Sequence, residues 1–471
     1  MNMIKTANTL WTASDAAHAA GGDAHPDWKA TGVSINTRTL QPGDLFIALQ
    51  GPNVDGHDYV ADAFEKGAAA ATVHHRPPVL DPDAPLLVVE DTMKALEDLG
   101  MEGRKRLDQG KVIAVTGSVG KTGVKEALKL VLGDQGKTSA SVGSLNNHWG
   151  LPLSLARIPA DADYAVLEMG MNHPGELTQL SKMGRPHVCV ITTIAPAHTE
   201  FFKDTFEIAD AKAEIFAGAE PGATAVLNLD IPEFERLHTA AQNAGMETVI
   251  TFGVNVQADF RVIAYELDGD GSLVTAVTPV GTVTYRVGSP GLHWVLNSLC
   301  VLAAVHAAGG DVARAGESLT EMSPPSGRGA RFEIARDGGA FQLIDESYNA
   351  SPAAMRAAMA VLVAQPVGAG GRRIVALGDM LEMGENSPRM HAELAEAIDA
   401  NGIDLAFLAG TDMKHLWDVL PESKRGHFAS DSEALAEVMQ SAVRPGDVVM
   451  VKGSAGTKMG RVVDALKQGE G

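Results

Sequence analysis

A glycine-rich turn between an apolar run and a helical stretch is the segment of this sequence whose residue types point most directly to chemistry. The run 111–115 (KVIAV) leads into residues 116–122 (TGSVGKT), and helical spacing follows over 124–132. Glycines allow consecutive backbone amides to surround a phosphate, and the N-terminus of the following helix adds a favourable dipole. Lys121 would neutralise phosphate charge, and the Thr122 hydroxyl would bind Mg²⁺. We therefore predict a nucleotide-phosphate site.

The spacing of this turn departs from the eight-position phosphate-binding motif, because Val115 stands where that motif has its first glycine. The alternative interpretation is a glycine turn followed by a chance Lys-Thr pair. A strand before the turn and a helix after it favour the phosphate site over that alternative.

Two residues that could bind a metal ion follow neighbouring apolar runs. Glu168 ends the run 164–167, and His198 lies just beyond the run 187–194. Open α/β sheets bind ligands at the carboxyl ends of their strands, so we expect both side chains above the phosphate loop. Each has a structural alternative, Glu168 as the neighbour of a helix cap and His198 as a loop histidine in a structural hydrogen bond.

Lys212 lies on the apolar face of a helix predicted over 208–219. Ile208 and Phe216 lie four residues before and after it on the same stripe. The commoner outcome for such a lysine is a buried stem whose ammonium group reaches water. The functional alternative is a desolvated amine of lowered pKa, which stays nucleophilic and could add CO₂ to become an anionic carbamate. The pattern alone leaves both open.

The elements that must position these residues follow an α/β rhythm. The N-terminal part has short β runs at 45–49 and 86–89, helical spacing over 59–71 and a charged helix over 92–109. In the middle of the chain, apolar strands each precede a helical segment, as in the βαβ units of a parallel sheet. Residues 259–287 alternate instead, which predicts an antiparallel hairpin or meander.

A helix is expected over 293–308, and the segment 323–327 (SPPSG) then breaks the pattern as linkers do. Beyond it, four apolar runs alternate with helices and predict a second parallel sheet: 341–344, 374–377, 405–408 and 448–451. We therefore expect an α/β protein of three domains, with bounds 1–108, 109–322 and 323–471.

Composition excludes several classes of protein. Hydrophobic residues make up 45% and charged residues 21% of the 471-residue chain, as in ordinary globular domains. The 38 Lys and Arg against 59 Asp and Glu give a net charge of −21, which disfavours nucleic acid as a partner. The two cysteines, Cys189 and Cys300, lie in apolar runs and favour buried thiols and the cytoplasm. No segment predicts membrane insertion.

Several motifs, in order along nearly the whole chain, resemble those of the ATP-dependent Mur ligases, which build peptidoglycan precursors. The matching segments are 116–122 (TGSVGKT), 168–176 (EMGMNHPGE), 211–216 (AKAEIF), 291–297 (GLHWVLN), 345–352 (DESYNASP) and 451–454 (VKGS). Residues 172–176 and 347–350 resemble the type that joins D-alanyl-D-alanine to UDP-N-acetylmuramoyl-tripeptide. The sister type that adds the third amino acid would show an Asp-Asn-Pro-Arg-like signature and a Tyr-Ala-His element, and the sequence has neither.

The resemblance implies a three-domain Mur ligase architecture, with a central phosphate-loop parallel sheet and a Rossmann-like C-terminal domain. It implies ATP binding by residues of the loop, by an adenine contact and by two residues of the C-terminal domain: Gly117, Ser118, Gly120, Lys121, Thr122, Asn297, Arg331 and Asp345. Arg328 remains a rival for Arg331. Thr122 and Glu168 would bind one Mg²⁺, and Glu168, His198 and carbamylated Lys212 a second. The implied catalytic residues are Lys121, Glu168, His198 and Lys212.

The resemblance also implies a set of substrate contacts. Those to the UDP-sugar are Ser34, Arg38, Asn53 and His57. Those in the central domain, beside the muramoyl peptide or on the substrate side, are Asn146, Asn147, Asn172 and His173. The weaker dipeptide-side candidates are Tyr348, Asn349 and Lys452. Two departures from the family pattern concern the dipeptide side: Ser351 replaces an asparagine before Pro352, and Ala455 stands where an arginine often follows Lys-Gly-Ser.

The implied reaction activates the tripeptide carboxylate as an acyl phosphate, which the amine of D-alanyl-D-alanine then attacks. UDP-MurNAc-tripeptide and D-Ala-D-Ala would be the partners of a monomeric enzyme. Three alternatives stay open: another Mur ligase, a ligase like the folate polyglutamylating enzymes, and a P-loop ATPase switch that acts on a protein partner.

Overall fold

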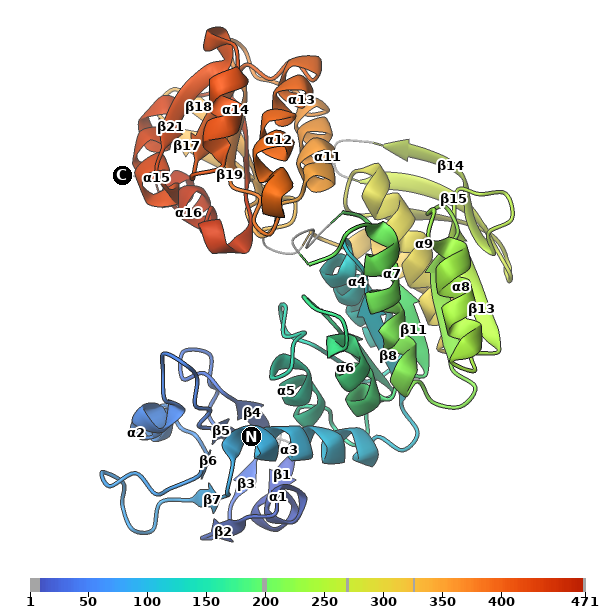
Figure 1. The fold of residues 1–471 in the computed structure, drawn as a ribbon, viewed down its shortest axis with the longest axis vertical. Helices are drawn as coiled ribbons and strands as arrows, with labels where there is room; N and C mark the ends of the chain where they lie inside the picture. Colours follow the sequence, from blue (N-terminus) through green and yellow to red (C-terminus); the bar gives the residue numbers. More distant parts are fainter. Residues whose placement is uncertain (1–8, 197–200, 268–270, 325–326, 469–471) are drawn as a thin grey trace, which may run out of the picture.

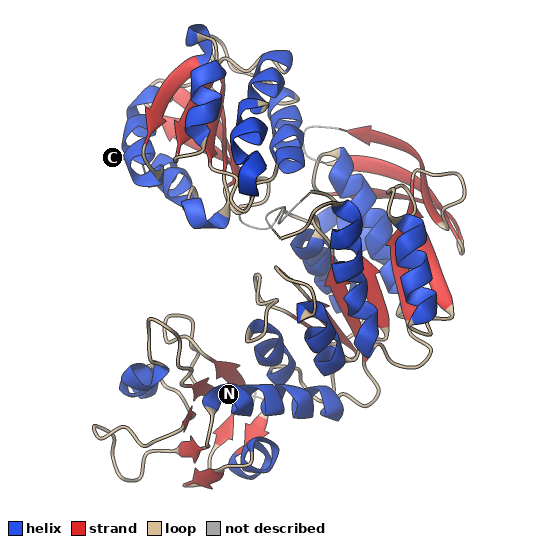
Figure 2. Cartoon of the chain, in the orientation of Figure 1, coloured by secondary structure: helices blue, strands red, loops and turns tan. Residues whose placement is uncertain are grey.

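The computed structural model describes residues 9–196, 201–267, 271–324 and 327–468, which form three α/β bodies along the long axis of the molecule (Figure 1). Each of the three large sheets takes its strands from one continuous stretch of chain. On this basis we propose domain boundaries at 108/109 and 322/323. Helices cover both faces of the central and C-terminal sheets (Figure 2).

The N-terminal body has a five-stranded sheet in the order β2-β7-β6-β5-β4 and a separate antiparallel pair, β1 and β3. Its strands are β1 (Trp11–Thr12), β2 (Asp23–His25), β3 (Lys29–Ala30), β4 (Gly32–Ser34), β5 (Asp44–Ile47), β6 (Ala70–Val73) and β7 (Leu86–Val88). Its helices are α1 (Ala13–Ala20), the 3₁₀ turn η1 (Gly56–Tyr59), α2 (Val60–Glu65) and α3 (Thr92–Arg106). α1 and α3 cover one sheet face, and α2 covers the other.

The helix predicted over 59–71 is too long. α2 ends at Glu65, and Ala70 already belongs to the buried strand β6. Gly67 has φ +92°, a left-handed conformation that a glycine adopts without a Cβ clash and that ends the helix. Because alanines fit a buried strand as well as a helix face, the spacing of Ala70 and Ala71 was misleading.

The central body is built on a nine-stranded sheet in the order β16-β15-β14-β13-β12-β11-β8-β10-β9. Its strands are β8 (Lys111–Thr116), β9 (Thr138–Ala140), β10 (Tyr164–Glu168), β11 (Val188–Ile191), β12 (Thr224–Asn228), β13 (Thr248–Gly253), β14 (Phe260–Leu267), β15 (Ser272–Thr278) and β16 (Gly281–Val287). Strands β8 to β14 pair in parallel, whereas β15 and β16 pair antiparallel. The predicted meander is thus confirmed, and it extends the parallel sheet.

Alternation along β8 shows how this sheet is buried on both faces. Val112 and Ala114 face one helical layer, and Ile113 and Val115 face the other. The helices of the first layer are α5 (Gly150–Ala156), α6 (Glu176–Gly184), α7 (Thr205–Ala213), the 3₁₀ turn η2 (Glu214–Gly218) and α8 (Phe234–Asn243). Those of the second are α4 (Lys121–Gly133), α9 (Leu292–Ala307), α10 (Val312–Ser318) and the 3₁₀ turn η3 (Leu319–Glu321).

The C-terminal body has a six-stranded sheet in the order β17-β18-β22-β19-β20-β21, parallel except for the β17–β18 hairpin. Its strands are β17 (Ala330–Arg336), β18 (Gly339–Glu346), β19 (Arg373–Gly378), β20 (Leu405–Ala409), β21 (Arg425–Ala429) and β22 (Val448–Lys452). Its helices are α11 (Pro352–Val363), α12 (Ser387–Ala392), α13 (Leu394–Ala400), α14 (Met413–Val419), α15 (Ser432–Ala442) and α16 (Gly460–Gln468), with 3₁₀ turns η4 (Gly384–Asn386), η5 (Glu422–Lys424) and η6 (Ala455–Thr457).

Both cysteines are buried free thiols, as predicted. No helix within the described residues combines the length and the apolar character that crossing a membrane requires. Arg104, at the end of α3, is buried and ties the N-terminal body to the central one. Its guanidinium donates to the carbonyls of Gly184 and Arg185, at 2.8 Å each, and to Glu220 at 2.9 Å.

His187, just before β11, is expected to make stability depend on pH. Its Nδ1 accepts a 3.0 Å hydrogen bond from the backbone N–H of Val112, so protonating this nitrogen would place two donors face to face. Burial, followed by the nearby charges of Arg104 and Lys111, lowers the pKa of His187 from 6.5 to about 4. Between these two pH values His187 is protonated in the unfolded chain but not in the folded protein. The free energy of unfolding therefore falls as pH falls.

The measurement is urea unfolding of the wild type and of His187→Asn at several pH values. Asparagine keeps an acceptor for Val112 but does not titrate. We expect the wild type to lose stability relative to the variant by at most about 1.4 kcal/mol per pH unit between pH 6.5 and about 4. His18→Asn, at an exposed position of α1, is the control. Parallel pH profiles for wild type and His187→Asn would contradict the assignment.

Candidate functional site: a nucleotide pocket between two domains

The phosphate loop joins the end of β8 to the start of α4. Gly117 and Gly120 have φ values of +147° and +91°, and a Cβ at Gly117 would collide with Oγ1 of Thr192. The partly buried Lys121 donates a 2.7 Å hydrogen bond from Nζ to the carbonyl of Gly117. Burial lowers the pKa of Lys121, Glu168 opposes that shift, and Arg328 adds to it. The loop therefore holds a desolvated amine where a phosphate would be bound.

Two buried oxygens beside the loop fit a hard cation. The Oε2 of Glu168, at the end of β10, and the Oγ1 of Thr122, in the first turn of α4, have no hydrogen-bond partner in the described part of the chain. The other carboxylate oxygen of Glu168 accepts a 2.7 Å bond from the Nδ2 of Asn146, which fixes the orientation of the carboxylate. Carboxylate and hydroxyl oxygens are suitable ligands for Mg²⁺. The site predicted for one magnesium ion is chemically consistent with these residues.

Lys212 is buried, with 1% of its surface exposed, so its ammonium does not reach water as the commoner alternative would have it. Burial, and then the charge of Lys121, lowers its pKa well below that of an ordinary lysine. The predicted helix over 208–219 is shorter than expected: α7 ends at Ala213, and η2 follows. Ile208 and Phe216 are buried as predicted.

His198 lies outside the described residues, so its predicted role stays a prediction. The linker predicted at 323–327 is likewise described only in part, because residues 325 and 326 lie outside.

A pocket of about 580 Å³ lies between the phosphate loop, α9 and the C-terminal body. Its lining includes Ser118, Gly120, Lys121, Trp294, Asn297, Arg328, Glu346 and Lys452. Asn297 faces the loop, because a Cβ on Gly120 would lie 3.0 Å from its Oδ1. Residues of both the central and the C-terminal domain line the pocket. This arrangement suits a nucleotide whose phosphates are bound by one domain and which is enclosed by the other.

Of the two arginines considered for ATP, the structure places Arg328 at this pocket. Its guanidinium lies 4.3 Å from the ring centroid of Tyr348. Arg331 lies on β17, and its NH1 donates a 2.9 Å bond to the Oε1 of Gln365. Asp345 is buried and accepts 3.1 Å bonds from the backbone N–H groups of Gly327 and Ser347, so its carboxylate holds the turn that carries Arg328.

A second cavity, of about 660 Å³, lies between α4 and the chain around Pro324, and Thr122 and Arg328 are among the residues that line it. Tyr348 donates a hydrogen bond from its hydroxyl to Ser144, which links the C-terminal body to the central one. Ser144 and Tyr348 both line this second cavity, and Arg328 lines both cavities.

The remaining predicted substrate residues have identifiable partners. Lys452 is buried and donates to the Oε2 of Glu346 at 3.0 Å and to the carbonyl of Asn349 at 2.9 Å. The Oδ1 of Asn147 accepts a 3.0 Å bond from the N–H of Gly150, at the start of α5. The exposed Asn172 and His173 both contact Glu176, through the Asn172 backbone N–H at 2.8 Å and the His173 Nδ1 at 3.1 Å.

The four residues predicted to hold the UDP-sugar all lie in the N-terminal body, and none of them lines either cavity. Ser34 is buried and its hydroxyl donates to the carbonyl of Asn36 at 3.1 Å, whereas Arg38 and Asn53 are exposed. His57 is buried beside Asp55. Their role as substrate contacts stays a prediction.

Sequence reasoning missed Lys125, which has no exposed surface. Its Nζ donates to the carbonyls of Ser141 at 2.9 Å and Gly143 at 3.2 Å, and so ties α4 to the loop that leads to Asn146. The signal was its position four residues after Lys121, on the same face of the helix. Ser351, the departure from the family pattern, caps α11: its Oγ accepts a 3.3 Å bond from the N–H of Ala354.

Three stretches of the chain match the sequence profiles of Mur ligase domains. Residues 29–102 match the profile described as the Mur ligase family, catalytic domain. Residues 115–305 match the Mur ligase middle domain, and residues 330–455 match the Mur ligase, glutamate ligase domain.

Full-length similarity extends to named proteins. The chain is 32% identical over 455 residues to the UDP-N-acetylmuramoyl-tripeptide–D-alanyl-D-alanine ligase of Rickettsia prowazekii, across 97% of this chain and 99% of that protein. It superimposes on MurF from Acinetobacter baumannii with a TM-score of 0.81 and 30% identity, covering 97% and 99% of the two chains. It superimposes on the MurF ligase of Thermotoga maritima in complex with ADP with a TM-score of 0.74 and 26% identity, covering 93% and 97%.

The placement of the two arginines predicts different effects on nucleotide binding. Arg328→Ala should weaken the binding of a non-hydrolysable ATP analogue by about tenfold or more, because a hydrogen bond to a charged group contributes about 1.5–3 kcal/mol. Arg331→Ala is the matched control and should change the affinity by less than about threefold. Isothermal titration calorimetry of both variants measures the difference. The opposite order would restore Arg331 as the nucleotide contact.

Proposed function

The chain belongs to the Mur ligase family, and from that premise we propose that it joins D-alanyl-D-alanine to UDP-N-acetylmuramoyl-tripeptide at the expense of ATP. The observation that carries this proposal is the similarity over nearly the whole chain to ligases of that name, in all three domains. The resemblance inferred from the motifs is thereby confirmed at the level of the family. The product would be the pentapeptide precursor of peptidoglycan.

The chemistry of amide formation explains why such an enzyme needs a phosphate loop. A carboxylate does not condense with an amine in water, because its oxygen is a poor leaving group. Phosphoryl transfer from ATP to the terminal carboxylate of the tripeptide forms an acyl phosphate, and the free amine of D-alanyl-D-alanine then displaces phosphate through a tetrahedral intermediate. Lys121 and the loop amides hold the phosphates and offset the charge that develops on them.

The metal-binding residues are proposed from the donors present. Thr122 and Glu168 would hold one Mg²⁺, and Glu168, His198 and a carbamylated Lys212 a second. Bound Mg²⁺ supplies positive charge that neutralises the transferring phosphoryl group. Lys212 as an ammonium would repel a cation, whereas the carbamate formed when its neutral amine adds CO₂ is an oxygen ligand. The lowered pKa of Lys212 favours the neutral, nucleophilic form of that amine.

The position of the nucleotide pocket supports a role for the C-terminal domain in protecting the intermediate. Residues of both domains line the pocket, so docking of the C-terminal domain encloses the nucleotide and excludes water. Water would hydrolyse the acyl phosphate. We place the reaction in the cytoplasm, consistent with the two free thiols.

The decisive experiment is an assay with Mg·ATP, D-Ala-D-Ala and UDP-MurNAc-tripeptide that ends in either lysine or diaminopimelate. We expect stoichiometric release of phosphate and formation of the pentapeptide, identified by mass, with at least one of the two tripeptides. Folate with glutamate, and the UDP-MurNAc dipeptide with a single amino acid, are the controls for the rival ligases. Phosphate release without any amide product would support the ATPase switch instead and remove the ligase assignment.

A second test concerns the carbamate. Lys212→Ala should reduce turnover by about a hundredfold or more. The variant lacks a ligand of the proposed second Mg²⁺, and weaker metal binding removes positive charge from beside the phosphates. Added formate or acetate should restore part of the activity by supplying an oxygen ligand in the space of the carbamate.

The control for this test is Lys203→Ala, near the start of α7, where the side chain is 87% exposed. Its turnover should equal that of the wild type, with or without added acid. Unimpaired turnover in Lys212→Ala would remove this residue from the site, and a loss that no short acid repairs would exclude the carbamate.

A further inference from the structure

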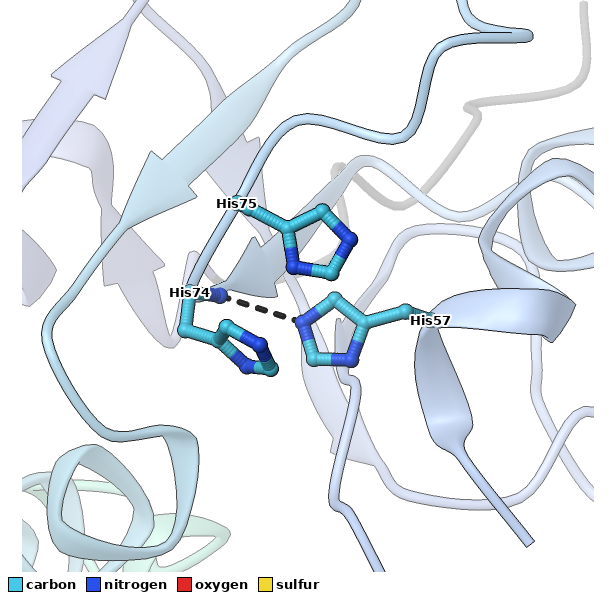
Figure 3. Close-up of side chains that lie close together, drawn as sticks. All are labelled: His57, His74 and His75. Carbon is cyan, nitrogen blue, oxygen red and sulfur yellow. Dashed lines mark hydrogen bonds between the residues drawn. The ribbon is translucent and has the colours of Figure 1, made fainter.

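Three histidine rings lie against one another in the N-terminal body, and none of them lines either cavity, although His57 is also a predicted UDP-sugar contact. His57 belongs to η1, and His74 and His75 directly follow β6. Ring centroids are 4.0 Å apart for His57 and His74, 4.7 Å for His57 and His75, and 4.6 Å for His74 and His75. Figure 3 shows the three rings grouped in a triangle, with the ring of His57 reaching toward those of His74 and His75 from another part of the chain. We refer to these residues as the histidine trio.

The buried member of the trio has its tautomer fixed by two hydrogen bonds. The Nδ1 of His57 lies 2.7 Å from the Oδ1 of Asp55, and its Nε2 accepts a 3.1 Å bond from the backbone N–H of His74 (Figure 3). With Nδ1 donating to the carboxylate, Nε2 carries the lone pair. A carboxylate behind one nitrogen of a histidine, with the lone pair of the other nitrogen facing its neighbours, is the arrangement that orients metal-binding imidazoles.

We propose that the histidine trio binds one divalent transition-metal ion of the Zn²⁺ class, with Asp55 orienting His57. One ligand nitrogen from each of the three rings lies within 4.8 Å of the other two, the only such set of three His, Cys, Asp or Glu side chains found among the described residues. Imidazole nitrogen suits Zn²⁺, Cu²⁺ and Ni²⁺, whereas Mg²⁺ prefers oxygen. Three protein nitrogens leave a fourth, open position for water.

Binding requires the exposed chain at His74 to move, because an ion on the lone pair of His57 would lie where the amide hydrogen of His74 now lies. Zn–N bonds of about 2.0–2.1 Å place tetrahedral ligand nitrogens about 3.4 Å apart, so the rings must approach by about an ångström. His74 and His75 are exposed and can turn, whereas His57 stays in place with Asp55. The metal would take the lone pair that His57 now offers to the N–H of His74, so this N–H must turn away from His57. It belongs to an exposed residue, where water can replace the lost acceptor.

The consequence for the fold is a cross-link between two segments of the N-terminal body. The trio joins the turn before α2 to the chain that follows β6. Along the sequence, these two segments are connected only through α2 and β6. This site has no residue in common with the phosphate loop, Glu168 or Lys212, but it shares His57 with the predicted UDP-sugar contacts. Zn²⁺ affinity measured without substrate therefore tests it separately from the proposed ligase reaction.

The test is calorimetric titration of the full-length chain, without a polyhistidine tag, with Zn²⁺ in the presence of excess Mg²⁺ to occupy oxygen sites. We expect one site per chain with micromolar or tighter affinity. His74→Gln and His75→Gln should each weaken it tenfold or more, and Asp55→Asn by about tenfold, the effect usual for a residue that orients a ligand. Because the two histidines are exposed, neither substitution endangers the fold.

Two further readings make the result decisive. His415→Gln, at an exposed position of α14, is the matched control and should leave Zn²⁺ affinity unchanged. Co²⁺ bound in place of Zn²⁺ should give the intense visible absorption of a four-coordinate site, and His75→Gln should abolish it. Millimolar affinity, or equal weakening in the control and in the trio variants, would overturn the proposal and leave three imidazoles in contact without a metal.

Discussion

The arrangement of the site depends on burying amines where their charge is not fully matched. The charge of Lys121 disfavours a charge on Lys212, whereas Glu168 favours the charged form of Lys121. A buried, unpaired ammonium is costly, so burial favours the neutral form of Lys212, and the partly buried Lys121 is suited to bind an anion. The phosphates of a nucleotide and a carbamate on Lys212 would both relieve this constraint. The electrostatics of this site thus favour the binding of a phosphate-bearing anion.

The sheet brings these groups together because parallel strands end at one edge. β8 leads into the loop with Lys121, its neighbour β10 ends at Glu168, and its other neighbour β11 ends at Ile191, just before Thr192, which packs against Gly117. Helices on both faces exclude water from the strands, so only the edge remains open. Lys125 fixes the loop that leads to Asn146 by donating a hydrogen bond to the carbonyl of Ser141. Asn146 in turn donates to the Oε1 of Glu168.

Much of this arrangement could be predicted from the chain because the signals are local. The strand before residue 116 and the helix after 120 place Lys121 and Thr122 without knowledge of the rest of the fold. The burial of Lys212 was left open, because the same stripe suits a lysine that reaches water. The helix over 59–71 was wrong in extent, since alanines at 70 and 71 fit either structure and only the backbone of Gly67 distinguishes them. Arg328 and the histidine trio depend on contacts between segments distant in sequence, which no spacing encodes.

The pocket that two domains share has a thermodynamic consequence. A ligand that touches both walls binds the docked arrangement better than the separated one, and so shifts the balance between them. Linkage is reciprocal: whatever else favours the docked arrangement must raise the affinity for nucleotide by the same factor. The hydrogen bond from Tyr348 to Ser144 joins the two domains directly and so is one interaction that favours the docked arrangement. Cooperativity between nucleotide and acceptor would then require no contact between the two molecules.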